Sequence, residues 1–313
     1  MRLTSLISIL ALALTAAACG DDGGKITPDA PKAGDIGFNK PTAPLKANHE
    51  VSKNNWMEDG PADLSCLNTP SNDMATTVAV DLTTRVDDFQ SGSARPGTTV
   101  TVFQNQDTGS PIGTAKVSDT NAMVTVNLPV GTKRFGFKMT QMDSLDTLLL
   151  NQTLNATMPA QTMTHIQIVS TATAQTLPAL IGVSRTNGTG ILAGAVRDCA
   201  GKEMSNFIAT VSSTEATATS PVSSVAHVAG VDTYYFSSSV GLPVRHSQQD
   251  FASKDGLFMA IEMAPTPTAY VQIWGYKTQA DVDADKLSLI AQLKSAVIGN
   301  VVITGSYDPF RTN

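Results

Sequence analysis

Short segments in which apolar and polar residues alternate, separated by turn signals, constrain this fold more than any other feature. Residues 76–83 (TTVAVDLT), 98–103 (TTVTVF) and 123–128 (MVTVNL) have the period of two expected of half-buried strands. Turn-forming residues such as Arg95-Pro96-Gly97 separate them, and similar segments run from residue 191 to residue 304. The sequence therefore predicts an all-β protein with two tandem antiparallel β-sandwich domains of transthyretin-like or immunoglobulin-like type.

Composition agrees with a folded body and excludes some partners. The chain has 313 residues, of which 42% are apolar and 15% charged, which is enough to bury a core in each of two domains. The formal net charge of −6 argues against nucleic acid as a partner. No run of Lys and Arg indicates binding to an anionic membrane surface.

The domains are expected at residues 63–185 and 186–313, because the order of turns and strands in the first set returns in the second. Chance similarity between two all-β halves is the alternative explanation. Within the second domain, residues 287–293 (LSLIAQL) fit either a strand or a short helix, since their period is ambiguous.

The N-terminus has the features of an export signal. Met1-Arg2 gives a positive start, an apolar stretch runs to Leu14, and small residues precede Cys19. Residues 1–18 resemble a bacterial lipoprotein signal peptide, with Ala16 at a position where that class more often has Leu. The resemblance implies cleavage before Cys19, acylation of its thiol with chains such as palmitate, and, from Gly20, the outer membrane. The alternative is an ordinary cleaved signal.

Residues 19–62 lack any apolar period. Residues 25–60 are rich in Pro, Lys, Ala and Asp, a composition that does not bury enough surface to fold. We therefore expect a disordered, flexible tether between a membrane anchor and the folded body.

The three cysteines are Cys19, Cys66 and Cys199. If Cys19 carries lipid, the other two are free to pair outside the cytoplasm. Two separate buried thiols are the alternative. A zinc site is not expected, since isolated cysteines lack the paired spacing that zinc sites require.

Two stretches of the second half carry a family resemblance: Gly194-Ala195-Val196-Arg197-Asp198, and Ser253-Lys254-Asp255-Gly256-Leu257-Phe258. They resemble the carboxypeptidase regulatory-like domain, a seven-stranded transthyretin-like sandwich. The first half is similar but has Asn121-Ala122 in place of Asp-Gly. The resemblance implies an accessory, binding or spacer module without catalysis of its own. Asp-Gly suits a tight turn, and Phe258 is expected in the core.

Two groups of side chains are candidate binding sites. Asp281, Asp283 and Asp285 resemble the start of a calcium loop but lack its later glycine and glutamate, so a solvated turn is the alternative. Tyr270, Trp274 and Tyr276 share one face of a strand, where they would stack on a sugar or pack in the core.

Catalytic motifs are absent from the sequence, and neither a cofactor nor a resident metal is expected. The sequence predicts a non-catalytic binding or structural module, held at the membrane by its lipid and contacting an envelope protein or a glycan. The alternative is an envelope hydrolase with a site built from His246, Asp250 and Asp255, which must converge in a cleft to act.

Overall fold

The computed structural model describes residues 40–230 and 232–312. The predicted signal peptide, Cys19 and the predicted tether as far as residue 39 lie outside the described residues.

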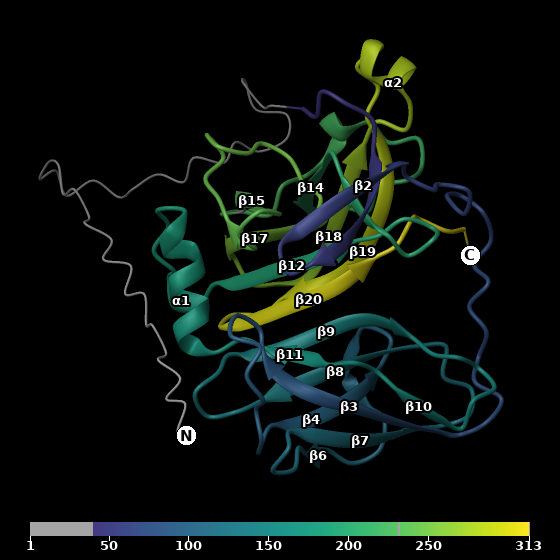
Figure 1. The fold of residues 1–313 in the computed structure, drawn as a ribbon, viewed down its shortest axis with the longest axis vertical. Helices are drawn as coiled ribbons and strands as arrows, with labels where there is room; N and C mark the ends of the chain where they lie inside the picture. Colours follow the sequence, from purple (N-terminus) through teal and green to yellow (C-terminus); the bar gives the residue numbers. More distant parts are fainter. Residues whose placement is uncertain (1–39, 231, 313) are drawn as a thin grey trace, which may run out of the picture.

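The first half of the chain forms a β-sandwich (Figure 1). Its strands are β3 (Val80–Asp88), β4 (Thr99–Gln104), β5 (Asp107–Pro111), β6 (Lys116–Val117), β7 (Met123–Leu128), β8 (Arg134–Thr140), β9 (Asp146–Thr153), β10 (Ala160–Thr162) and β11 (Ile166–Ile168). One layer has β3 paired with β7, β10 and β11, and the other runs β9-β8-β4-β5 with β6 also on β4. The predicted alternation is visible in β3, where Val80, Leu82 and Val86 are buried between the layers.

The second half has the same two-layer plan. Its elements are β12 (Gly190–Val196), β13 (Glu203–Ser205), β14 (Phe207–Ser212), β15 (Asp232–Ser237), β16 (Leu242–Pro243), β17 (Leu257–Met263), β18 (Thr266–Gly275), β19 (Ser288–Val297) and β20 (Val301–Tyr307), with a 3₁₀ turn at Val222–Ser224 and helix α2 (Gln279–Asp283). The layer β16-β15-β17-β12-β20 packs on the layer β14-β18-β19 around Phe207, Tyr235 and Phe258. Of the ambiguous stretch 287–293, all residues but Leu287 belong to strand β19.

The two halves share a sheet. Strand β20, near the end of the chain, lies between β12 and β9 and pairs in parallel with both, so one ten-stranded sheet runs from β16 to β5 (Figure 1). The predicted all-β sandwich fold is confirmed, but its pairings are not all antiparallel, since β20 is parallel to β12 and β9, and β10 and β11 are parallel to β3. Strand direction is set here by long connections that bring distant segments together, which local alternation does not reveal.

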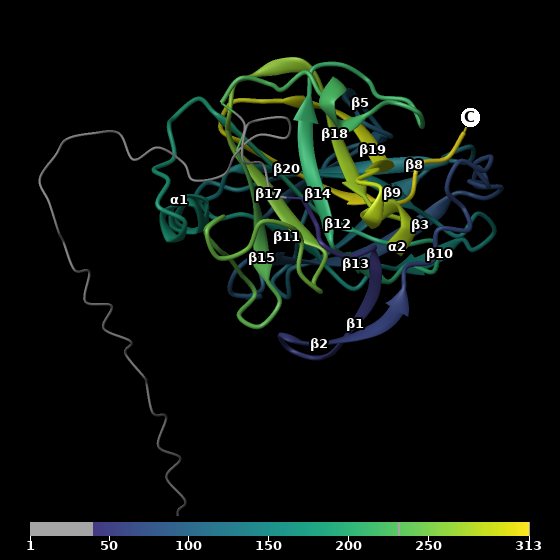
Figure 2. The same cartoon turned by 90° about the horizontal axis from the view of Figure 1, so that it is seen from above.

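The predicted tether of residues 19–62 is wrong for its described part. Strands β1 (Lys46–Ser52) and β2 (Asn55–Pro61) form a hairpin, and β1 pairs with β13 (Figure 2). Leu45 and Ala47 anchor it in the core. Both faces of the hairpin are otherwise largely exposed, so its sequence shows no apolar alternation, and backbone pairing stabilises it instead.

Candidate functional site

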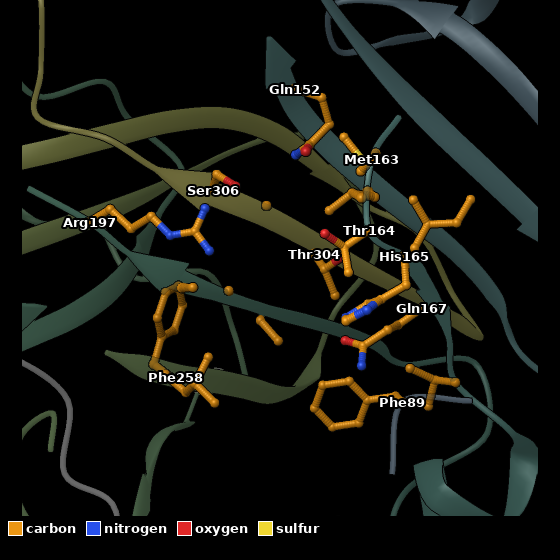
Figure 3. A pocket seen from close by; sticks show the side chains of 18 of the residues that line it. Phe89, Gln152, Met163, Thr164, His165, Gln167, Arg197, Phe258, Thr304 and Ser306 are labelled. Carbon is orange, nitrogen blue, oxygen red and sulfur yellow. The ribbon is translucent and has the colours of Figure 1, made fainter. Parts of the chain in front are cut away.

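An open groove lies on one face of the shared sheet (Figure 3). Alternation decides what that face presents: Leu148 and Leu150 of β9 enter the core of the second half, whereas Leu149 points to the other side. On that side the layer of β3 and β11 covers β4, β8 and β9, and helix α1 (Thr171–Leu180) covers one end of β12, β17 and β20. The sheet between these two covers is open and has a cavity volume of about 540 Å³.

Small side chains make the floor of the groove. In register, Ala193 and Ala195 of β12 lie beside Thr304 and Ser306 of β20. The intervening Gly194 faces the core, where a Cβ would overlap the Tyr307 ring and the carbonyl of Gly305. The Tyr307 ring therefore fills the core side of the sheet behind Gly194. On the groove side the side chains are small and leave space for a ligand.

One end of the groove is apolar. Phe89 and Phe236 meet edge to face there, with ring centroids 6.5 Å apart. The same rings continue into a smaller cavity of about 40 Å³ beneath α1, which Leu177, Pro178 and Met259 also line. Its exposed surface is entirely apolar. Water has no hydrogen-bond partners in such a space, so an apolar group is the better occupant.

The other end of the groove has a positive charge. Arg197 Nε donates to Glu203 Oε1 at 3.4 Å, and within residues 40–230 and 232–312 its Nη1 and Nη2 have no hydrogen-bond partner. Figure 3 shows the guanidinium directed toward Ser306 and the open groove. The Arg197 side chain is 42% exposed, so its two terminal nitrogens are available to a ligand.

The rim between the two ends is polar. His165 and Gln167, at the start of β11, and Gln152, from β9, lie around the floor (Figure 3). His165 is exposed and directly precedes β11. Sequence reasoning missed this site. The available signal was the run Ala193-Gly194-Ala195 inside a strand, since such small residues leave a sheet face unfilled.

The aromatic stripe for which stacking on a sugar and packing in the core were both open is mostly core. Trp274 is 0% exposed and donates from Nε1 to Thr210 Oγ1 at 3.0 Å. Tyr276 is also buried and donates its hydroxyl to Asp285 Oδ1 at 2.6 Å, and burial together with that carboxylate raises its pKa. Only Tyr270 is half-buried, and it lines a separate hollow near Arg134. Of the two alternatives, core packing holds for Trp274 and Tyr276, because Ala216 and the residues around it cover this face of the sheet.

The three candidate calcium ligands have separate partners. Asp281 caps α2 in a capping box with Thr278, Asp283 accepts a hydrogen bond from Gln279, and Asp285 pairs with Lys40 at 2.6 Å. Within the described part of the chain, no group of three or more His, Cys, Asp or Glu side chains has an arrangement able to hold a metal ion. The structure thus engages these carboxylates in helix capping and ion pairing.

Of the residues of the alternative hydrolase site, His246 and Asp250 lie together, whereas Asp255 is buried in a turn. His246 Nδ1 is 2.8 Å from Asp250 Oδ1, but the ring is 5% exposed and packs beside Tyr235. Asp255 is buried in the turn before β17, where its Oδ1 accepts from the Leu257 backbone and its Oδ2 has no partner. Burial, with a smaller effect of the Glu203 charge, raises the pKa of Asp255 to about 7.

Cys66 and Cys199 form a disulfide, with their Cα atoms 5.8 Å apart. It links the segment after the β1–β2 hairpin to the turn after β12, and the backbone amide of Cys199 also donates to Asp63. The pairing predicted from the cysteine count is present. The remaining cysteine, Cys19, lies outside the described residues.

Comparisons with known proteins give no family. No family model and no curated protein matches the chain. Among solved structures, the TIE protein of Bacillus anthracis is 11% identical with a TM-score of 0.23 over 74% of this chain, which spans 34% of that protein. Shaft pilin SpaA from Lactobacillus rhamnosus GG is 12% identical with a TM-score of 0.22, over 75% of this chain and 98% of the pilin. A streptococcal ancillary pilin is 13% identical with a TM-score of 0.21, over 75% and 63%.

These scores are too low to support an argument about function, so the proposals below rest on the chain's own residues. Among the described residues, every helix is too short or too polar to cross a membrane.

Proposed function

We propose that this chain is an exported lipoprotein, anchored through Cys19 to the outer membrane, whose β body acts as a non-catalytic binding module. The observation that carries the proposal is the disulfide between Cys66 and Cys199. Disulfides persist in oxidising compartments outside the cytoplasm. Pairing of these two leaves Cys19 as the one unpaired cysteine of the sequence, at the position where the signal-like segment ends.

The build of the body supports a binding role. The floor of the groove is formed by β12 and β20, which are regular strands of the sheet that both halves share. The disulfide also links an N-terminal segment to the second half. Binding sites positioned by strands hold their geometry better than sites on loops alone. The groove offers an apolar end, a polar rim and one available guanidinium, whereas the candidate catalytic imidazole of His246 is buried.

Fractionation of cells that express the full chain tests the anchor. We expect the wild-type protein in the outer-membrane fraction and in the detergent phase after phase partitioning, because several acyl chains contribute about 0.8 kcal/mol per buried methylene. Cys19→Ser is expected in the soluble envelope fraction with its disulfide intact. A matched Cys66→Ser/Cys199→Ser variant is expected to stay with the membrane, since it keeps the lipidation site. Membrane association of Cys19→Ser equal to that of wild type would contradict the proposal.

A further inference from the structure

We propose that the groove over β12 and β20 binds an extended peptide of about four residues, with a bulky apolar side chain at one end and a carboxylate at the other. This inference rests on the proposed binding function but not on the lipid anchor. It follows from three independent properties of the groove: the charges of its lining, the apolar cavity at one end, and the distance between that cavity and Arg197.

Charge selects the sign of the ligand. The chain as a whole is acidic, with a formal net charge of −6. The groove lining nevertheless includes Arg197 and, among the described residues that form it, neither Asp nor Glu. Arg197 uses only Nε on Glu203, at a long 3.4 Å, which leaves the two terminal nitrogens of the guanidinium pointing at the open space. A guanidinium in this state suits a carboxylate, to which it donates two parallel hydrogen bonds.

The opposite end selects an apolar group. The cavity beneath α1 adjoins the groove, because Phe89 and Phe236 line both, and Leu177 and Met259 also line it. A side chain that enters it replaces poorly held water and loses no hydrogen bond of its own. The cavity of about 40 Å³ is smaller than a leucine or phenylalanine side chain, so we expect such a side chain to lie in the groove against Phe89, with only its tip in the cavity.

The length of the groove between Arg197 and the apolar end, and the polar side chains along it, favour a peptide as the ligand. Ala193, at the apolar end, and Arg197 are four residues apart on extended chain, which corresponds to about 13 Å, the length of four extended peptide residues. Gln152 and Gln167 flank this stretch with side-chain amides, which pair well with backbone N–H and C=O groups.

Other ligand classes fit less well. A sugar requires an exposed aromatic face, but Phe236 is 3% exposed and Phe258 is 1% exposed, so only Phe89 presents part of a ring. A fatty acyl chain would leave Gln152, Gln167, Thr304 and Ser306 facing methylene groups, with hydrogen bonds to water lost.

Calorimetry with defined peptides tests the proposal on the full-length Cys19→Ser chain, free of detergent. The probes are acetylated, amidated Phe-Ala-Ala-Asp and Asp-Ala-Ala-Phe, which cover both chain directions, with Asn in place of Asp as neutral counterparts. We expect one acidic probe to bind at least tenfold more tightly than its Asn counterpart. Because the lipid is absent, failure here and failure of the anchor proposal are separate results.

Variants locate the binding. Arg197→Gln is expected to remove the tenfold preference for Asp over Asn, Arg197→Lys to restore part of it, and Ala195→Leu to weaken both probes by filling the floor. Lys138→Gln, a change of exposed charge on β8 outside the groove lining, is the matched control and is expected to bind as wild type does. Unchanged melting temperatures confirm that each variant is folded. The proposal is overturned by absence of binding, by equal binding of Asp and Asn probes, by Arg197→Gln without effect, or by a neutral sugar or a fatty acid binding the same groove more tightly.

Discussion

The turns before β7 in the first half and before β17 in the second half have the same left-handed residue position, but one has alanine there and the other glycine. In the first half, Ala122 adopts a left-handed conformation with φ +62°, and the Asp119 side chain accepts from the backbone amides of Asn121 and Met123. In the second half, Gly256 has φ +65°, and Asp255 accepts from Leu257. The backbone is alike, but a Cβ on Gly256 would lie 2.9 Å from the Val196 carbonyl. Close approach of a neighbouring strand, rather than the turn itself, decides which half requires glycine.

The same contrast extends to the cores. The core around β3, β7 and β8 is built from strands between residues 80 and 168. The second core also receives Leu45 from beyond the N-terminal side of the first half, and its edge is fastened by Cys66. The second core is therefore held by a disulfide and by an N-terminal side chain, neither of which has a counterpart among the described residues of the first core.

The largest effect is expected from removing the disulfide. Cys66 and Cys199 are separated by 133 residues, and loop entropy predicts that Cys66→Ser/Cys199→Ser lowers the free energy of unfolding by about 4–5 kcal/mol. Hydrogen exchange should show protection falling first in β14, β18 and β19, with β3 and β7 retained. Cys19→Ser is the control and should leave stability unchanged. Equal loss of protection in both halves would show that the disulfide does not stabilise the second half in particular.

The buried carboxyl of Asp255 gives the second half a pH dependence. Its pKa is raised to about 7 in the folded protein, so folding favours the protonated form, and the stabilisation is complete below about pH 4. As pH rises from 4 to 7 it is lost, by at most about 4 kcal/mol. Asp255→Asn should therefore become more stable than wild type across this window, measured by denaturant unfolding at several pH values. Parallel pH profiles for the two proteins would show that the buried carboxyl has no such role.

Arg134 joins the two halves. Its guanidinium donates to Asp73 at 2.6 Å and 3.0 Å, to Asn151 at 3.0 Å, and to Asp308 near the end of the chain at 3.3 Å. Arg134→Gln should lower the free energy of unfolding by about 2–3 kcal/mol, because hydrogen bonds to charged groups are lost at a largely buried site. Urea unfolding measures this, with Lys138→Gln, which removes an exposed ion pair with Asp146 within the first half, as the control expected to cost less than about 1 kcal/mol.

The smallest pair of effects tests the turn comparison directly. Gly256→Ala should cost about 2 kcal/mol, from the left-handed backbone and the approach to the Val196 carbonyl. Ala122→Gly should change stability by less than about 1 kcal/mol, because relief of backbone strain is offset by loss of a buried methyl group. Thermal unfolding of the two variants measures both. A larger cost for Ala122→Gly than for Gly256→Ala would refute the explanation.

Local patterns predicted much of the fold. Alternation located the strands of the first half, Asp255-Gly256 marked a turn with a left-handed glycine, and Phe258 is in the core as expected. These features depend on neighbouring residues, whose spacing is visible in the sequence.

What the sequence missed depends on contacts between distant segments. The hairpin of residues 46–61 is held in place because β1 pairs with β13, which lies about 155 residues later in the chain. Trp274 is buried because Ala216, Val222 and Val225 from the segment after β14 pack over its face of the sheet. The groove exists because β20 returns to lie beside β9. Period-two alternation tells which face a residue is on, but not what covers that face.

Intact mass spectrometry of the protein extracted from native membranes, with thiols alkylated before reduction, tests the central claim most directly. The account predicts a chain that begins at Cys19, carries the mass of a diacylglyceryl group and further acyl chain, and takes up no alkylating reagent, because Cys66 and Cys199 are paired. A mature N-terminus at another residue, or an alkylated Cys19 without lipid, would contradict it.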